Sequence, residues 1–292
     1  MTRSSGPAIR VRRAGALTTI QDCGRPGYAH LGVPRSGALD APAHHEANRL
    51  AGNVPGAAVL ETTLTGVALT VDGDVTAAVT GAPAEVRVDG QAALLGKPVK
   101  LRRGQLLDVR TAQSGVRSYV AFSGGLAVPR VLGSASADLL SGLGPARLAD
   151  GNVLPLGVPG AAHGGPGCAL GELPVLAQEY VLLYPGPRAD WLVSPGLTAL
   201  EKGDWTVTPD SNRVALRLAG LPVGRRRGEL ASEGLVAGAI QALPDGHLVL
   251  FLADHPTTGG YPVIAVADPV CLAACAQARP GSTVRFRLAP AR

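Results

Sequence analysis

Short apolar stretches separated by turn residues dominate the sequence between residues 58 and 122. The separators include Asp72-Gly73, Gly81, Asp89-Gly90 and Ser114-Gly115. Aspartate–glycine pairs and lone glycines between apolar runs are typical of tight turns that join neighbouring strands. The pattern predicts six strands, at residues 59–63, 67–71, 75–80, 85–88, 105–110 and 118–122. Six strands at this spacing indicate a barrel or a sandwich.

The rest of the chain continues this mainly β pattern and adds a few short helices. A strand within residues 8–20 runs into a glycine-rich bend, and a helix over residues 41–51 has Asp40 as its cap. Residues 158–171 are the best linker candidate. Further strands are expected at residues 175–184, 213–218, 238–242, 248–252, 263–266 and 281–288, and helices at residues 190–201 and 268–277. A chain of 292 residues suits two domains, which we place at residues 1–165 and 166–292.

Charge and hydropathy exclude several classes of function. The chain has no run of about 18 apolar residues that could cross a membrane, and no apolar signal-peptide core follows Arg13. We therefore expect a cytoplasmic protein without a membrane partner. The net charge is only +5, and the cluster Arg225 to Arg227 has no aromatic neighbours for base stacking, which argues against nucleic-acid binding. The cluster is interpreted as a solvated loop, with an anion-binding or subunit-facing role as the alternative.

The metal-binding and nucleotide-binding motifs that we tested do not match. The four cysteines have no C-x-x-C spacing, and His44 and His45 should point about 100° apart on a helix, so we expect no metal. The segment from Gly90 to Pro98 has the wrong glycine spacing for a phosphate loop, and no G-x-G-x-x-G motif follows a strand. ATP would therefore have to be bound by another chain. Ser36 has no sequence signal of a paired base, which leaves a serine hydrolase a remote alternative.

Four stretches of the sequence are harder to explain as scaffold. Residues 17–27 place an amide, a carboxylate and a guanidinium beside a glycine-rich bend. Residues 32–40 end on Asp40, for which a helix cap and a site residue are equally good interpretations. Residues 232–241 combine an acid and an amide with small residues that permit close backbone approach. Residues 252–262 follow an apolar strand with hydroxyls, glycines and a tyrosine, which suits a pocket for an oxyanion or a carboxylate.

Blocks of residues in these stretches resemble one family of proteins. The blocks are Thr18-Thr19-Ile20-Gln21-Asp22, Gly24-Arg25-Pro26-Gly27, Ser36-Gly37-Ala38-x-Asp40, Ala47-Asn48, Gly52-Asn53, Leu60-Glu61, Ser232-Glu233-Gly234, Gly238-Ala239-Ile240-Gln241 and Thr257-Thr258-Gly259-Gly260-Tyr261-Pro262. They look like the signature of the family of KipA, the 5-oxoprolinase C-subunit and allophanate hydrolase subunit 2, a biotin-dependent carboxyltransferase family. The resemblance extends from about Val11 to Phe286.

The resemblance implies a mainly β fold of cyclophilin-like β-barrels, two in tandem, and an active cleft shared with a companion subunit. Members of the family carboxylate an amide nitrogen with carboxybiotin, or open a lactam with consumption of ATP. Both reactions require that an amide is held and that its developing negative oxygen is stabilised. The resemblance makes Arg25, Asp254 and Glu233 the catalytic candidates, the two carboxylates as proton acceptors. The candidates for substrate binding are Gln21, Asp40, Gln241, Thr257, Thr258, Gly259, Gly260 and Tyr261.

Three functions are compatible with this family. The leading hypothesis is a subunit of a heteromeric ATP-dependent 5-oxoprolinase, a hydrolase that converts 5-oxoproline to glutamate and is active only with its partners. The partners would be a companion subunit of the KipI or allophanate hydrolase subunit 1 type and a third, amidohydrolase-like subunit. The alternatives are a biotin-dependent carboxyltransferase subunit that acts on urea or a related amide, and a KipA-like regulatory protein that antagonises a kinase inhibitor.

No cofactor is expected to be bound by this chain alone. ATP would be bound by a partner subunit, because the sequence contains no nucleotide-binding signature. Carboxybiotin would come from a separate carrier in the carboxyltransferase alternative. The acceptor lysine for biotin normally lies between methionines, and Met1 is the only methionine of the chain.

Overall fold

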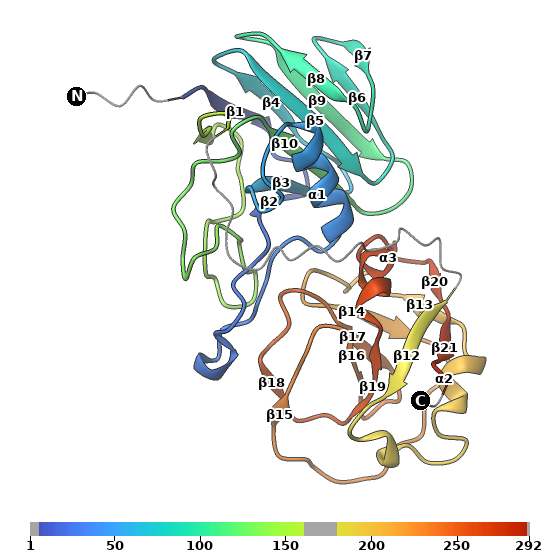
Figure 1. The fold of residues 1–292 in the computed structure, drawn as a ribbon. Coiled ribbons are helices and arrows are strands. Elements are labelled where there is room, and N and C mark those ends of the chain that lie inside the picture. The colour runs from blue at the N-terminus through green and yellow to red at the C-terminus, as the bar shows by residue number, and fades with distance from the viewer. Residues whose placement is uncertain (1–5, 161–179, 291–292) are drawn as a thin grey trace. The chain divides into compact units, whose positions relative to one another are not determined.

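The computed structural model describes residues 6–160 and 180–290. The chain divides into two compact units, of which unit 1 comprises residues 1–26 and 36–171 and unit 2 comprises residues 27–35 and 172–292. Strands predominate in both units (Figure 1). The domain boundary that the sequence analysis places after residue 165, and most of the linker candidate, lie outside the described residues.

Two antiparallel sheets form unit 1. The first has the order β11-β1-β4-β9-β6-β7, with β1 (Ala8–Arg13), β4 (Ala68–Val71), β6 (Ala84–Val88), β7 (Gln91–Ala93), β9 (Leu106–Ala112) and β11 (Val153–Pro155). The second has the order β2-β3-β10-β5-β8, with β2 (Leu17–Gln21), β3 (Val59–Thr63), β5 (Val75–Gly81), β8 (Pro98–Leu101) and β10 (Arg117–Phe122). The six strands predicted between residues 58 and 122 are confirmed as β3, β4, β5, β6, β9 and β10.

A hydrophobic core joins the two sheets of unit 1. Ile9 and Val11, alternate residues of β1, contribute to the same buried cluster as Leu60 of β3 and Val120 of β10. The opposite face of the five-stranded sheet is covered by α1 (Ala41–Leu50), as Figure 1 shows. All six residues of β10 are buried, because this strand has packed neighbours on both faces.

The helices are short, and their ends follow from local chemistry. The side chain of Asp40 accepts a hydrogen bond of 3.0 Å from the backbone N–H of Ala43, so the predicted helix and its cap are confirmed. The helix predicted at residues 190–201 is wrong in its middle, where Pro195 separates η2 (Ala189–Trp191) from α2 (Thr198–Lys202). The helix predicted at residues 268–277 is present as η3 (Pro269–Cys271) followed by α3 (Leu272–Ala276).

An eight-stranded sheet in the order β20-β13-β14-β17-β16-β19-β12-β21 forms the centre of unit 2. Its strands are β12 (Val181–Pro185), β13 (Trp205–Val207), β14 (Ala215–Ala219), β16 (Ala239–Ala242), β17 (Leu248–Phe251), β19 (Val263–Ala267), β20 (Thr283–Val284) and β21 (Phe286–Leu288). Only Arg285 separates the two edge strands in sequence, so one continuous segment supplies both edges and the sheet nearly closes into a barrel. The predicted mainly β fold is confirmed.

A two-stranded ribbon and a 3-10 turn complete unit 2. The ribbon pairs β15 (Glu233–Gly234) with β18 (Thr258–Gly259) outside the eight-stranded sheet, and the 3-10 turn is η1 (Ala29–Leu31). Of the helices in the described ranges, none combines the length and the apolar character that a membrane crossing requires.

Candidate functional site

In unit 1, the buried carboxylate of Asp22 organises the end of β2. Its Oδ1 accepts hydrogen bonds from the hydroxyls of Ser134 and Ser136, both at 2.6 Å, and from the backbone N–H of Gly24 at 2.9 Å. Its Oδ2 accepts from the backbone N–H of Ala135 at 2.7 Å and from Arg130 at 3.2 Å. Five donors therefore stabilise a carboxylate that is 0% exposed, and they fix residues 134–136 against the bend that follows β2.

The guanidinium of Arg25 is directed into the same part of unit 1. Its Nη1 donates to the hydroxyl of Ser36 at 3.1 Å, its Nε donates to the carbonyl of Val131 at 3.4 Å, and its Nη2 donates to the carbonyl of Ser136. The hydroxyl of Ser36 donates to Asp138 at 2.8 Å. Because Arg25 is only 1% exposed, this geometry favours a positioning role for the residue, and its predicted catalytic role stays a prediction.

Gln21 and Asp40 lie in polar surroundings that the sequence did not reveal. The Nε2 of Gln21 donates to the hydroxyl of Thr19 and to the carbonyl of Ala137, while its buried Oε1 has no hydrogen-bond partner within the described residues. The backbone N–H of Asp40 donates to the hydroxyl of Tyr119 at 2.8 Å, in addition to the cap that the Asp40 side chain makes. The cap is confirmed, and a contact of either residue with substrate stays a prediction.

Glu61 and Tyr119 join these segments to the centre of the five-stranded sheet. The hydroxyl of Tyr119 donates to Glu61 at 2.8 Å, and the same carboxylate oxygen accepts the backbone N–H of Leu39 at 3.0 Å. Burial, followed by the charge of Glu61, raises the pKa of Tyr119 well above its usual range. The block Leu60-Glu61 contained a signal for this network, whereas nothing in the sequence pointed to Tyr119.

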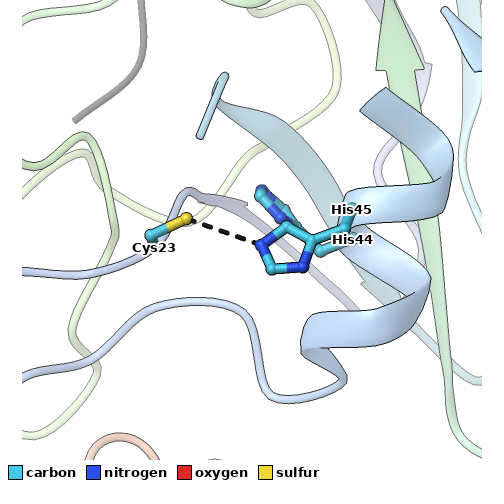
Figure 2. Close-up of side chains that lie close together, drawn as sticks. All are labelled: Cys23, His44 and His45. Atoms are coloured by element: carbon cyan, nitrogen blue, oxygen red, sulfur yellow. Dashed lines mark hydrogen bonds between the residues drawn. The ribbon is translucent and has the colours of Figure 1, made fainter. Parts of the chain in front are cut away.

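A second cluster in unit 1 contains Cys23, His44 and His45 (Figure 2). One possible metal-ligand atom of each residue lies within 4.8 Å of the other two. The expectation that the side chains of these neighbouring helical histidines point apart is therefore wrong. The Nε2 of His44 lies 3.2 Å from the carbonyl of Ala57, and burial and the neighbouring His45 lower the pKa of His44 to about 4. His44 is thus a neutral, hydrogen-bonded packing residue at neutral pH, and the absence of a metal stays a prediction.

In unit 2, Asp254 forms a buried ion pair with Arg213. The two carboxylate oxygens accept one hydrogen bond each from the guanidinium, both at 2.9 Å, and the two side chains are at most 1% exposed. The backbone N–H of Asp254 also donates to the carbonyl of Arg213 at 3.1 Å. A carboxylate held on both oxygens by a guanidinium is a poor proton acceptor, so the geometry favours a structural role.

The third and fourth predicted stretches meet in unit 2. Glu233 pairs with Gly259 and Gly234 pairs with Thr258, and Gln241 donates to the carbonyl of Tyr261 at 2.8 Å. We call residues 233–234 and 257–261 the Glu233 ribbon. Thr258, Gly260 and Tyr261 are exposed on it. Most of the predicted substrate-binding residues are therefore neighbours in unit 2, although their contact with a substrate stays a prediction.

The close packing of the Glu233 ribbon explains one of its glycines. A Cβ at position 259 would lie 2.8 Å from the side chain of Leu235 and 3.1 Å from the Nε2 of Gln241. Glycine therefore allows the ribbon to lie directly on the apolar side chain of Leu235, with the amide of Gln241 beside it.

Arg188 holds the carboxylate of Glu233. Its Nε donates to both oxygens of Glu233, at 2.9 and 3.1 Å, and its Nη2 donates to Oε1. The hydrogen bond from Arg188 holds the pKa of Glu233 below its usual range, which makes Glu233 a weaker base than a free glutamate. No sequence signal pointed to Arg188, because Gly186-Pro187-Arg188 has the composition of an ordinary turn.

Comparison with known proteins identifies the family of this chain. The family described as carboxyltransferase domain, subdomain A and B, matches residues 31–288. The C-subunit of the Escherichia coli 5-oxoprolinase is 36% identical over 282 residues, which are 95% of this chain and 90% of that protein.

Two solved structures have the same fold as this chain. The crystal structure of TTHA0988 matches with a TM-score of 0.83 and 35% identity over 98% of this chain, which spans 57% of that chain. The crystal structure of the K. lactis urea amidolyase matches with a TM-score of 0.86 and 29% identity over 97% of this chain, which spans 19% of that chain. Together with the order of its signature blocks, these matches establish that the chain belongs to the carboxyltransferase domain family, subdomains A and B.

Proposed function

We propose that this chain is a subunit of a heteromeric, ATP-dependent 5-oxoprolinase, which opens the lactam of 5-oxoproline to give glutamate. The observation that carries this proposal is the extent of the match to the 5-oxoprolinase C-subunit, which covers 95% of this chain and 90% of that protein. The same chain spans only 19% of the urea amidolyase. The identity to the 5-oxoprolinase C-subunit, 36%, is also higher than the 29% identity to the urea amidolyase.

The Glu233 ribbon supports amide chemistry in this proposal. Opening a lactam places negative charge on the amide oxygen, and exposed hydroxyls or backbone N–H groups that are held in place stabilise such charge. Thr258 and Tyr261 offer hydroxyls on the exposed surface of the ribbon, and Gln241 fixes the backbone of Tyr261. We assign these groups to substrate binding. Asp254 supports the loop that precedes them in unit 2, and Arg25 supports the loops that it contacts in unit 1.

The reaction requires components that other chains would supply. In the proposed complex, a companion subunit of the KipI or allophanate hydrolase subunit 1 type completes the active cleft. A third, amidohydrolase-like subunit takes part, ATP is bound by a partner, and the complex works in the cytoplasm. The match over nearly the full length of the 5-oxoprolinase C-subunit supports the presence of partners, since that relative is by its name one subunit of an enzyme.

Transfer of a carboxyl group to urea or a related amide is the second candidate. The fit to the K. lactis urea amidolyase favours it, because the TM-score of 0.86 extends over 97% of this chain. In that case a separate carrier would deliver carboxybiotin to the site. The amide-binding groups of the Glu233 ribbon would have the same task in both reactions.

The test is release of glutamate from 5-oxoproline and ATP by the chain purified together with its companion subunits. Tyr261→Phe removes only an exposed hydroxyl and should lower turnover roughly 100-fold or more, the usual loss for one donor to a developing oxyanion. Tyr180→Phe is the matched control, because Tyr180 packs its ring 4.1 Å from the guanidinium carbon of Arg287, a contact that phenylalanine retains. Turnover of urea with carboxybiotin instead would favour the second candidate. Inactivity of a folded complex on both substrates would favour the regulatory function.

A further inference from the structure

The guanidinium of Arg188 is held on one edge and open on the other. Glu233 accepts from Nε and Nη2, which form the side edge of the guanidinium plane. Within the described ranges 6–160 and 180–290, Nη1 donates no hydrogen bond, although the charge of Asp190 also acts on the guanidinium, and the Arg188 side chain is 39% exposed. Since a guanidinium carries five N–H donors, the Nη1 and Nη2 end retains a second fork that can bind a carboxylate.

The backbone fixes this open fork beside the Glu233 ribbon. The N–H of Arg188 donates to the carbonyl of Val263 at 3.0 Å, and the N–H of Gly186 donates to the carbonyl of Ile264 at 2.9 Å. The first residue of β19 is Val263, which follows Tyr261 by two residues. Both ends of the Arg188 residue are therefore anchored, the backbone on β19 and the guanidinium on β15.

The contribution of the Arg188–Glu233 pair to stability does not explain its geometry. Exposed ion pairs contribute little to stability, because water screens them and two long side chains lose rotamer freedom. Three hydrogen bonds to one carboxylate instead pre-orient the guanidinium before a ligand arrives. Pre-orientation of this kind lowers the entropic cost of ligand binding.

We propose that Arg188, oriented by Glu233, binds the carboxylate of the substrate while the exposed hydroxyls of the Glu233 ribbon bind its amide. This inference rests on the proposed function and names the substrate class as amides that carry a carboxylate, of which 5-oxoproline is one. A neutral amide such as urea, or a lactam without the acid, would leave the fork of Arg188 unpaired. Glu233 is in this assignment a positioning residue.

The experiment measures binding and turnover separately on the complex assembled with its companion subunits. Calorimetry gives the Kd for 5-oxoproline and for 2-pyrrolidinone, the same lactam without a carboxylate, and glutamate release gives KM and kcat. Arg188→Gln should weaken 5-oxoproline binding and raise KM roughly 10- to 100-fold, the range expected for a lost charged hydrogen bond. The Kd for 2-pyrrolidinone and the kcat at saturation should change less than about threefold, because neither depends on a carboxylate contact.

Two further variants separate recognition from general charge. Glu233→Gln keeps Arg188 but removes its anchor, so it should raise KM by a smaller factor than Arg188→Gln. Arg285→Gln removes the same charge from an exposed pair with Asp204 in unit 2 and should leave the Kd for 5-oxoproline unchanged. An unchanged Kd in Arg188→Gln, in a complex that still releases glutamate, overturns the inference alone. A wild-type complex that neither binds nor turns over 5-oxoproline overturns the proposed function and this inference together.

Discussion

Replacement of Asp254 by asparagine should destabilise unit 2 rather than remove a chemical step. Arg213 and Asp254 are at most 1% exposed and share two hydrogen bonds of 2.9 Å. Asp254→Asn removes a carboxylate that pairs with a buried guanidinium, and removing one partner of a buried pair typically costs about 3–5 kcal/mol of unfolding free energy. The double variant Arg213→Met, Asp254→Leu buries no charge, so it should recover most of this loss.

Urea unfolding followed by tryptophan fluorescence measures these losses directly. The two tryptophans of the chain, Trp191 and Trp205, both lie in unit 2, so the signal reports on the unit that contains the pair. Asp204→Asn is the matched control, because it breaks an exposed pair with Arg285 and should cost less than about 1 kcal/mol. A loss below about 1 kcal/mol for Asp254→Asn, together with lost turnover in the assembled complex, would refute the reasoning and restore Asp254 as the proton acceptor.

Three further perturbations test other parts of the structure. The pKa of His44 is about 4 in the folded chain and 6.5 without burial, so the unfolded state binds the proton first and stability falls as the pH drops from about 6.5 towards 4. His44→Gln keeps a hydrogen-bond donor to the carbonyl of Ala57. It should reduce the difference in unfolding free energy between pH 7 and pH 4.5 by about 2–3 kcal/mol, measured by urea unfolding monitored by circular dichroism. Gly259→Ala should cost about 1–3 kcal/mol in the tryptophan assay because its Cβ would lie 2.8 Å from Leu235, whereas Gly234→Ala, with no atom within 4 Å, should be nearly neutral. Asp22→Asn leaves the five hydrogen-bond donors with one acceptor oxygen fewer, so it should lower the free energy of unfolding by about 2–4 kcal/mol. Residues 130–138 should then be cleaved more readily by a protease, and unchanged resistance of these residues to proteolysis would contradict the prediction.

The sequence alone determined the elements whose causes are local. The strand β3 (Val59–Thr63) was predicted to the residue, because β-branched residues and flanking turns act over a few positions. The cap at Asp40 was predicted for the same reason, since a cap reaches only three residues along the chain. The helix at residues 190–201 failed where Pro195 outweighed the helix-forming residues around it.

The sequence also selected the segments that form the candidate site, through the order of its blocks. It could not assign roles within them, because a role depends on which distant groups surround a side chain. Asp22 contacts Ser134 across 112 positions, and Glu233 meets Arg188 across 45. No local pattern records such partners.

Only the tertiary structure decided which charges are buried and which are open to solvent. Folding encloses Arg25 and Asp254 among their own hydrogen-bond partners, whereas it leaves one end of Arg188 exposed beside the Glu233 ribbon. The three residues carry ordinary charged side chains in the sequence. Burial and pairing, which depend on contacts between remote segments, separate the groups that support the fold from those that can meet a ligand.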